Sequence, residues 1–236
     1  MYILRLSNDR GQTLTDWLNS RHTFSFGTYF DPNFRGFSDL LVINDDIVAP
    51  SQGFGMHPHD NMEIISIVLS GMLEHRDSLG NDGVIKSGEI QKMSAGFGIT
   101  HSEYNPSTVD PVHFLQIWIV PEEKNLPPSY EQKKFGLNQT HNQLCLVAAN
   151  EENEEIIRIH QDVRLYQSIL DCSRCLSYTL DKSRAVWIQV AQGSVMVNDN
   201  LLMAGDGLGI WDEERQITIQ GADDRSHFLL FDLSGN

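Results

Sequence analysis

The sequence predicts an all-β fold in which two barrels share one scaffold. Short segments rich in β-branched residues recur along the chain of 236 residues and are separated by glycine-containing turns, a pattern typical of β-sandwiches and barrels. The segment at 64–71 (IISIVLSG) resembles the segment at 186–193 (VWIQVAQG), and SGE at 87–89 resembles AGD at 204–206. Such internal similarity indicates that one supersecondary scaffold is repeated.

In chain order, the first half is expected to consist mainly of strands, with one helical turn at 14–19. The expected strands of this half cover residues 2–6, 22–26, 40–44, 62–69, 72–76, 90–93 and 112–120. Segment 121–135 contains Pro127-Pro128 and several charges, which makes it the best candidate for a linker. We therefore expect an N-terminal barrel at residues 1–130.

The second half reads as a further series of short strands, which predicts a C-terminal barrel at residues 131–236. These strands are expected at residues 143–148, 156–159, 163–170, 176–180, 186–190, 195–197, 207–210, 216–219 and 228–233. The acidic segment 150–155 between them is expected to be a solvated loop.

Composition excludes several classes of function. The net charge is −15 and no basic cluster stands out, which argues against direct binding of nucleic acid. No apolar run is long enough to span a membrane, and the N-terminus has no signal-peptide pattern, so we expect a soluble, cytoplasmic protein. Three cysteines argue against a disulfide framework, and Cys172 and Cys175 in a single CxxC are expected to be free thiols rather than a zinc or redox pair.

Two short motifs carry the chemistry. His57 and His59 are separated by one residue, as are His101 and Glu103. On a β-strand this spacing places both side chains on one face, roughly 7 Å apart. Two such strands facing one another can present three imidazoles and a carboxylate to one divalent transition metal. The alternative, four hydrogen-bonded polar residues inside a barrel, is costly unless every group is paired.

The repeat predicts that the second barrel lacks these ligands. Carried across without gaps, the two histidines of the first motif map near Thr179 and Asp181, and the second motif maps near Thr218 and Gln220. The second barrel is therefore expected to be structural.

These motifs resemble the two-motif layout of a cupin (jelly-roll) barrel, so the repeat predicts a bicupin. The positions that carry this resemblance are His57, His59, Glu63, Gly71, Gly88, Gly96, His101, Glu103 and Asn105. More narrowly, the chain resembles the pirin family, and within it the short bacterial-type pirins with quercetin 2,3-dioxygenase activity. The segments that carry this second resemblance are HTFSF at 22–26, YFDPNF at 29–34, HPH at 57–59, SAG at 94–96, HSEYN at 101–105, QIW at 116–118, VWIQV at 186–190 and LLFD at 229–232.

The pirin resemblance implies an enzyme that binds a flavonol and O2, opens the heterocycle and releases carbon monoxide. It implies that His57, His59, His101 and Glu103 hold the metal, with iron as the first expectation and nickel, copper, manganese, cobalt or zinc as alternatives. Either Glu103, by loosening its metal bond, or Glu63, from outside the ligand set, would take the proton of the flavonol hydroxyl.

Further residues are candidates for the surroundings of this site. Glu63 is an even number of residues from His57 and His59, so on a continuous strand the three side chains would share a face. This parity allows Glu63 to contact the metal ligands, and a purely structural hydrogen bond is the alternative. His75 has the same parity on a neighbouring strand, where we expect a partly exposed histidine. A cavity for an aromatic ligand is expected to be lined by Phe24, Phe26, Phe97, Ile99, Gln116 and Trp118.

Two other functions are compatible with the sequence. Some eukaryotic pirins are metal-dependent regulatory proteins, and this resemblance implies binding to a protein partner without catalysis. A cupin sugar isomerase is disfavoured, because the neighbourhood of the motifs is aromatic and no basic phosphate site is present. Without a sequence feature that favours association, we expect a monomer.

Overall fold

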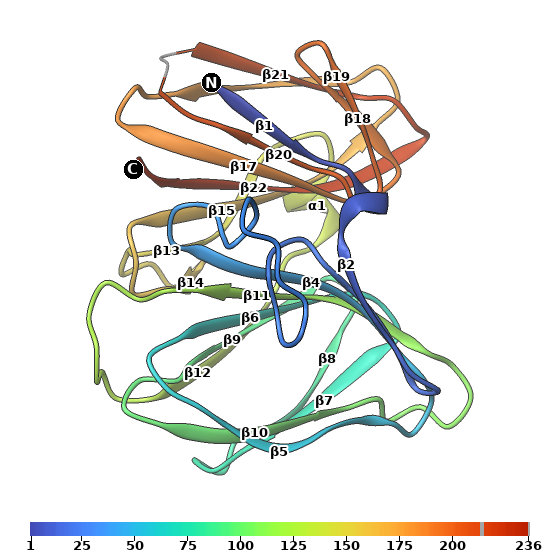
Figure 1. Cartoon of the computed structure of the whole chain (residues 1–236), viewed down its shortest axis with the longest axis vertical. Coiled ribbons are helices and arrows are strands. Elements are labelled where there is room, and N and C mark those ends of the chain that lie inside the picture. The colour runs from blue at the N-terminus through green and yellow to red at the C-terminus, as the bar shows by residue number, and fades with distance from the viewer. Residues whose placement is uncertain (213–214, 236) are drawn as a thin grey trace.

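Two β-barrels stack along the long axis of the molecule in a computed structural model that describes residues 1–212 and 215–235 (Figure 1). The described residues form four sheets, one of seven strands and one of four strands in each barrel. This arrangement confirms the predicted all-β, two-barrel fold. Among these residues, no helix is long and apolar enough to cross a membrane.

The N-terminal barrel contains two sheets that face each other. Its larger sheet consists of β2 (Gly11–Leu14), β3 (Leu18–His22), β4 (Leu40–Val48), β6 (Glu63–Ser70), β9 (Glu89–Ser94), β11 (Val112–Ile119) and β12 (Ser129–Lys134), in the order β12-β9-β6-β11-β4-β3-β2. Its smaller sheet consists of β5 (Gly53–His59), β7 (Met72–Asp77), β8 (Asp82–Lys86) and β10 (Ile99–Tyr104), in the order β5-β10-β7-β8.

The C-terminal barrel repeats this plan. Its larger sheet consists of β1 (Tyr2–Arg5), β13 (Cys145–Ala149), β14 (Ile157–Arg158), β15 (Val163–Asp171), β17 (Arg184–Gln192), β20 (Gly207–Ile210) and β22 (Arg225–Ser234), in the order β1-β20-β17-β22-β15-β13-β14. Its smaller sheet consists of β16 (Cys175–Leu180), β18 (Ser194–Val197), β19 (Asn200–Met203) and β21 (Arg215–Gly221), in the order β16-β21-β18-β19.

Helical structure is confined to short segments in the part of the chain that is described. A single 3-10 turn covers Ser7–Asp9, and α1 covers Leu137–Thr140. The helical turn expected at 14–19 is wrong, because these residues form the turn from β2 to β3. There the Thr15 side chain accepts a hydrogen bond from the backbone N–H of Leu18, at 3.1 Å, and stabilises the turn without a helix.

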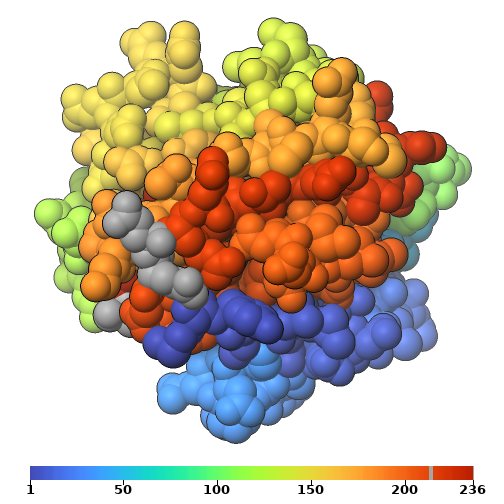
Figure 2. All heavy atoms as spheres, turned by 90° about the horizontal axis from the view of Figure 1, so that it is seen from above, coloured from blue at the N-terminus to red at the C-terminus, as the bar shows by residue number. Residues whose placement is uncertain are grey.

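The N-terminal strand joins the other barrel, whereas the end of the N-terminal half stays with its own barrel. Strand β1 pairs with β20, so the N-terminus extends the larger sheet of the C-terminal barrel. Figure 2 shows this first segment in blue beside the orange strands of that barrel. Strand β12, at the C-terminal end of the segment expected to be a linker, pairs with β9 and completes the N-terminal barrel beyond residue 130.

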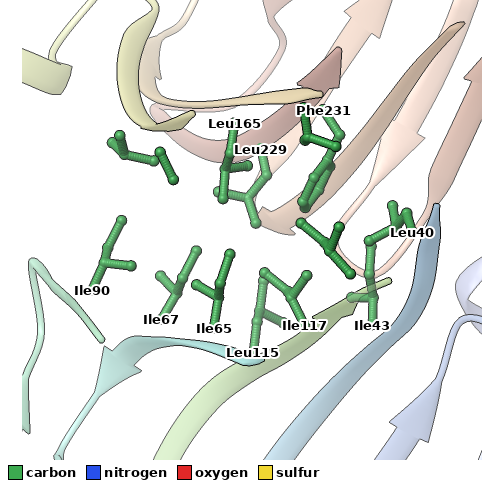
Figure 3. Packing of buried hydrophobic residues seen from close by; sticks show 14 of the residues in the cluster. Leu40, Ile43, Ile65, Ile67, Ile90, Leu115, Ile117, Leu165, Leu229 and Phe231 are labelled. Carbon is green, nitrogen blue, oxygen red and sulfur yellow. The ribbon is translucent and has the colours of Figure 1, made fainter. Parts of the chain in front are cut away.

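The main hydrophobic core lies between the barrels, where the two larger sheets pack against each other (Figure 3). Ile65, Leu115 and Ile117 of the N-terminal barrel face Leu229 and Phe231 of the C-terminal barrel, and all five are buried. Burial of each such side chain is worth about 1.5–3 kcal/mol. Because successive residues of a strand face opposite sides, Ser66 on β6 and Gln116 on β11 point into the N-terminal barrel, where both contact Glu103.

The internal repeat is visible at equivalent turns. Gly71 and Gly193 follow β6 and β17, and their φ angles are +77° and +72°. A Cβ atom would lie 2.7 Å from the carbonyl oxygen of Pro111 at the first turn and 2.7 Å from that of Arg225 at the second. Only glycine fits both turns without a shift. A cluster of buried apolar side chains, including Val186, fills much of the interior of the C-terminal barrel.

Candidate metal centre and its cavity

A row of polar side chains crosses the larger sheet of the N-terminal barrel from β12 to β3. Strand pairing places one residue of each strand directly opposite the next along this row. The row consists of His22, Asn44, Gln116, Ser66, Gln91 and Gln132. Apolar residues flank several of these positions, so the barrel interior has a polar belt at one level, and the smaller sheet faces this belt.

The three motif histidines come together on the smaller sheet. His57 on β5 is the direct partner of His101 on β10. The ring centroids of His57 and His101 are 4.5 Å apart, those of His59 and His101 are 4.9 Å apart, and those of His57 and His59 are 4.8 Å apart. One ring nitrogen from each of the three lies within 4.8 Å of the others. This spacing suits ligands that converge on one cation.

The state of these nitrogens fits a metal. The Nδ1 atom of His57 donates to the carbonyl oxygen of Gly55 at 2.7 Å, which leaves Nε2 with its lone pair. The Nε2 atom of His101 is buried and has no hydrogen-bond partner among the described residues. Burial, with repulsion from neighbouring histidines, lowers the pKa of His101 to about 3 and that of His59 to about 4. Both rings are therefore neutral, as metal ligands must be.

Glu103 lies next to the three histidines. Its carboxylate is buried and accepts hydrogen bonds from Ser66 Oγ at 3.0 Å and from Gln116 Nε2 at 2.5 Å, both from the polar row. A carboxylate oxygen lies within 4.8 Å of ring nitrogens of His101 and His75. Glu103 thus lies close to His101, one member of the histidine cluster. Hydrogen bonds from the larger sheet fix the orientation of the Glu103 carboxylate.

His75 is fully buried, so the expected partial exposure is wrong. Its Nδ1 lies 3.5 Å from Nδ1 of His101, and its Nε2 lies 3.3 Å from Oδ2 of Asp77. The Oδ1 atom of Asp77 in turn accepts the backbone N–H groups of Leu79 and Asn81. These contacts fix His75 beside Nδ1 of His101. Partners of this kind, next to a ligand, orient its ring in metal sites.

Glu63 lies outside this cluster. It belongs to β6 of the larger sheet and has the parity of Ile65, which faces the C-terminal barrel. Its carboxylate accepts a hydrogen bond from Ser94 Oγ at 2.9 Å and lies 3.3 Å from Nδ1 of His160. Parity with the histidines does not bring Glu63 to them, because they lie on the other sheet.

A cavity of about 260 Å³ opens between the two sheets beside the histidines. Of the residues proposed from the sequence for an aromatic pocket, Phe26, Gln116 and Trp118 line this cavity. Phe24 is buried between the barrels, with its ring centroid 4.9 Å from that of Trp187. Phe97 is 66% exposed and lines a shallow depression next to His59 and Thr100, separate from this cavity.

The expected residue Ile99 is buried in a small apolar cluster with Ile64 and Met93, beside Trp118 but outside the cavity lining. The sequence reasoning also missed a set of cavity residues on β2 to β5. These are Thr13, Leu18, Ser20, His22, Asn44, Asp46 and Phe54. The segment 42–48 (VINDDIV) does not alternate between apolar and polar residues, so no local pattern marks Asn44 and Asp46 as inward-facing.

Comparisons with known proteins agree with this geometry. A family model described as Pirin matches residues 4–119, and one described as quercetinase C-terminal cupin domain matches residues 146–233. A protein of Escherichia coli K12 named quercetin 2,3-dioxygenase is 48% identical over 233 residues, which cover 99% of each chain.

Solved structures show the same similarity. The crystal structure of YhhW from Escherichia coli has a TM-score of 0.95 and 47% identity, and the match covers 100% of this chain and 99% of that one. The structure of the bacterial pirin YhhW in complex with nickel(II) has a TM-score of 0.94 and 46% identity, with 100% of both chains covered.

Proposed function

Because this chain belongs to the pirin family, we propose that it is a metal-dependent flavonol dioxygenase of the quercetin 2,3-dioxygenase type. In this reaction O2 adds across the heterocycle of the flavonol, the ring opens and carbon monoxide leaves. The observation that carries the proposal is a cluster of three imidazoles, with the buried carboxylate of Glu103 beside one of them, at the wall of a cavity lined by aromatic rings. The similarity to a quercetin 2,3-dioxygenase supports the substrate class.

We assign His57, His59, His101 and Glu103 as the residues that hold a divalent transition metal. The unpartnered Nε2 of His101 and the neutral state of the His59 and His101 rings support this assignment. A bound metal of this kind supplies a Lewis acid with open positions, which favours the ionised form of a flavonol hydroxyl and suits O2 chemistry. Iron is our first expectation, and nickel is supported by the nickel complex of the related pirin.

Glu103 is the proton acceptor in this proposal. It is a carboxylate of the cluster that also lines the cavity, so a flavonol hydroxyl can approach it. Gln116 and Ser66 hold both of its oxygens and keep the carboxylate aimed at the cavity while the proton moves. Glu63 is the weaker candidate because it is not among the residues that line the cavity, and its carboxylate contacts Ser94 and His160 instead.

The cavity walls orient the substrate and exclude water. The Trp118 ring lies edge-on to His59, with centroids 5.0 Å apart, and edge-on to Phe26, with centroids 5.4 Å apart. Phe54 and Leu18 close the other end. Flat apolar walls favour a planar ring system, and the exclusion of water strengthens each polar contact made inside.

The test is to measure O2 consumption and carbon monoxide release with flavonols, together with metal content. We expect His57→Ala and His101→Ala to lose metal and turnover together. Glu103→Gln is expected to keep part of the metal and to turn over poorly. Normal O2 consumption by the Glu103→Gln protein would remove this residue from the mechanism. No turnover of any flavonol by the metal-loaded protein would contradict the proposed activity.

A non-catalytic regulatory role has one observation in its favour. Met56 and Phe97 are 61% and 66% exposed, and they lie beside the metal motifs on β5 and on the turn before β10. Exposed apolar side chains of this kind can contact a protein partner. A regulatory pirin would consume no O2 with flavonols, and its affinity for a partner would change with the oxidation state of the metal.

A further inference from the structure

The end of the cavity formed by Leu18, Ser20 and Phe54 contains a carboxyl group that the proposed reaction does not use. Asp46 on β4 lines the cavity and is only 2% exposed. Ser20 on β3 is its direct partner across the strand pair. Its Oδ1 atom has no partner in the part of the chain that the structure describes. A buried oxygen without a partner costs stability, and a structural carboxyl would normally have both oxygens paired.

The neighbouring polar groups do not supply the missing contact. His22 is held on both sides, because its Nδ1 lies 2.8 Å from Asn44 Oδ1 and its Nε2 lies 2.9 Å from Thr13 Oγ1. In the neutral ring one nitrogen donates and the other accepts, so Nδ1 donates to Asn44 and Nε2 accepts from Thr13. These three side chains form a closed network beside Asp46. The unsatisfied atom therefore belongs to Asp46 and not to its neighbours.

The position of Asp46 relative to the metal centre follows from the strand register. Asn44 is directly opposite Gln116, whose amide holds Glu103. Asp46 is two residues further along β4, so its Cα lies about 7 Å along the strand from the level of Glu103. A planar ligand that meets the metal centre with one ring can therefore extend a second ring toward Asp46. The apolar side chains of Leu18 and Phe54 lie at this end of the same cavity.

We infer that Asp46 binds a hydroxyl group on a ring of the substrate other than the ring that meets the metal centre. This inference rests on the proposed function for the identity of the aromatic ligand. It deepens that proposal, because an Asp46 contact would favour polyhydroxylated flavonols over 3-hydroxyflavone. Asp46 is a specificity-determining residue in this scheme and takes no part in bond breaking.

The protonation state of Asp46 is compatible with this role. Burial, with the negative charges of Asp45 and Glu103, raises the pKa of Asp46 to about 7. Near neutral pH the carboxyl group exists in both forms, so it can accept a hydrogen bond from a phenol or donate one to it. In either form Oδ1 gains the partner that it lacks within the described protein.

A second unpartnered atom lies in the cavity wall at the opposite end. The indole Nε1 of Trp118 is buried and has no acceptor within the described residues. Trp118 is four residues along β11 from Phe114, which is the direct partner of Asp46. The two groups are thus separated by about 13 Å along the sheet. A ligand with oxygen atoms at both ends of a flat ring system would satisfy both.

The test compares 3-hydroxyflavone, which has no other hydroxyl, with flavonols that carry hydroxyls on the outer rings. Dissociation constants are measured without O2 on nickel-loaded protein, from the absorbance of the bound flavonol, and kcat/KM is measured with O2. In the Asp46→Ala protein we expect the preference for the hydroxylated flavonols to fall roughly 10- to 100-fold, the factor of one lost hydrogen bond to a carboxyl group. Affinity for 3-hydroxyflavone should stay within about twofold, a change of less than half a kcal/mol.

Two further variants serve as a conservative substitution and as a matched control. Asp46→Asn retains an acceptor and a donor and should restore part of the preference. Asp45→Ala is the matched control, because Asp45 is adjacent on β4 but faces outward, where it contacts Arg10 and His113. This control removes a charge near Asp46 but should leave the preference unchanged, because the Asp46 carboxyl group can pair with a phenol in either protonation state. Metal content and thermal unfolding of each variant show whether it is folded.

An equal loss for both kinds of flavonol in Asp46→Ala, or no loss for either, would overturn the inference. This result is distinct from a failure of the proposed function. If the wild-type protein binds flavonols with an Asp46-dependent preference but does not consume O2, the inference stands and the dioxygenase proposal fails. If it turns over flavonols with a preference that Asp46→Ala leaves intact, the dioxygenase proposal stands and the inference fails.

Discussion

Replacing Gln116 with leucine tests whether the polar row of the larger sheet sets the metal affinity of the smaller one. The Gln116 amide donates to Glu103 at 2.5 Å, and both side chains are largely buried. Leucine has a similar volume but cannot donate, so one oxygen of a buried carboxylate loses its partner. Gln91 lies on the same row and is the matched control, because neither of its side-chain polar atoms has a partner within the described chain.

The magnitudes follow from these contacts. A hydrogen bond to a charged group contributes about 1.5–3 kcal/mol, which corresponds to roughly 10- to 150-fold in an equilibrium constant. Loss of a group that orients a metal ligand typically lowers metal affinity about 10- to 100-fold. We therefore expect Gln116→Leu to weaken metal binding by that factor. Gln91→Leu removes an unpaired buried amide, so it should leave metal affinity unchanged and raise the free energy of unfolding by about 1–3 kcal/mol.

The assay is competition between the protein and a chelator for nickel(II), with urea unfolding of the metal-free proteins measured in parallel. The unfolding data separate a local loss of ligand orientation from a general loss of structure. Equal nickel affinity in the Gln116→Leu and wild-type proteins would refute the argument that this amide orients Glu103. A loss of affinity in Gln91→Leu that matches the loss in Gln116→Leu would show that the row acts through packing and not through the hydrogen bond.

Three more predictions follow from the site. The pKa of Asp46 rises from 3.8 to about 7 on folding, so between these values the native protein keeps a proton that the unfolded chain releases, and the free energy of unfolding falls as pH increases. Asp46→Asn removes this pH dependence. The difference in free energy of unfolding between Asp46→Asn and wild type, measured in urea, should therefore grow from about pH 4 to about pH 7 and then stay constant. Nickel at about 1,000 times its dissociation constant should raise the free energy of unfolding of the wild type by about 4 kcal/mol, which a higher melting temperature would report. A comparable rise in His57→Ala would exclude His57 as a metal ligand. Glu103→Gln should lose flavonol turnover while Glu63→Gln keeps it and loses only the contacts with Ser94 and His160; equal losses of kcat would return Glu63 to the list of candidate bases.

The sequence alone determined the features that depend on local geometry. The two-residue period of a strand places His57 with His59 and His101 with Glu103, whatever the rest of the chain does. Turn glycines are similarly local, since Gly71 and Gly193 have positive φ angles that other residues rarely adopt. From these motifs and the repeat, the all-β double barrel and the location of the histidine cluster could be predicted.

Tertiary structure decided which faces meet. Glu63 has the parity of the histidines, yet it faces the other barrel because it lies on the opposite sheet. Phe24 packs against Trp187 and not in the cavity, and His75 is buried behind His101. Parity says which residues of one strand share a face, but the pairing of distant strands sets what that face contacts.

The same reason explains the polar row and Asp46. Their residues come from strands far apart in the sequence, and only the register of the sheet aligns them beside Glu103. No local pattern links Asn44 to Gln116 or Ser66. The chain thus encoded the ligands in short motifs, whereas the cavity and the groups that orient the ligands arose from long-range strand pairing, which depends on the packing of the whole barrel.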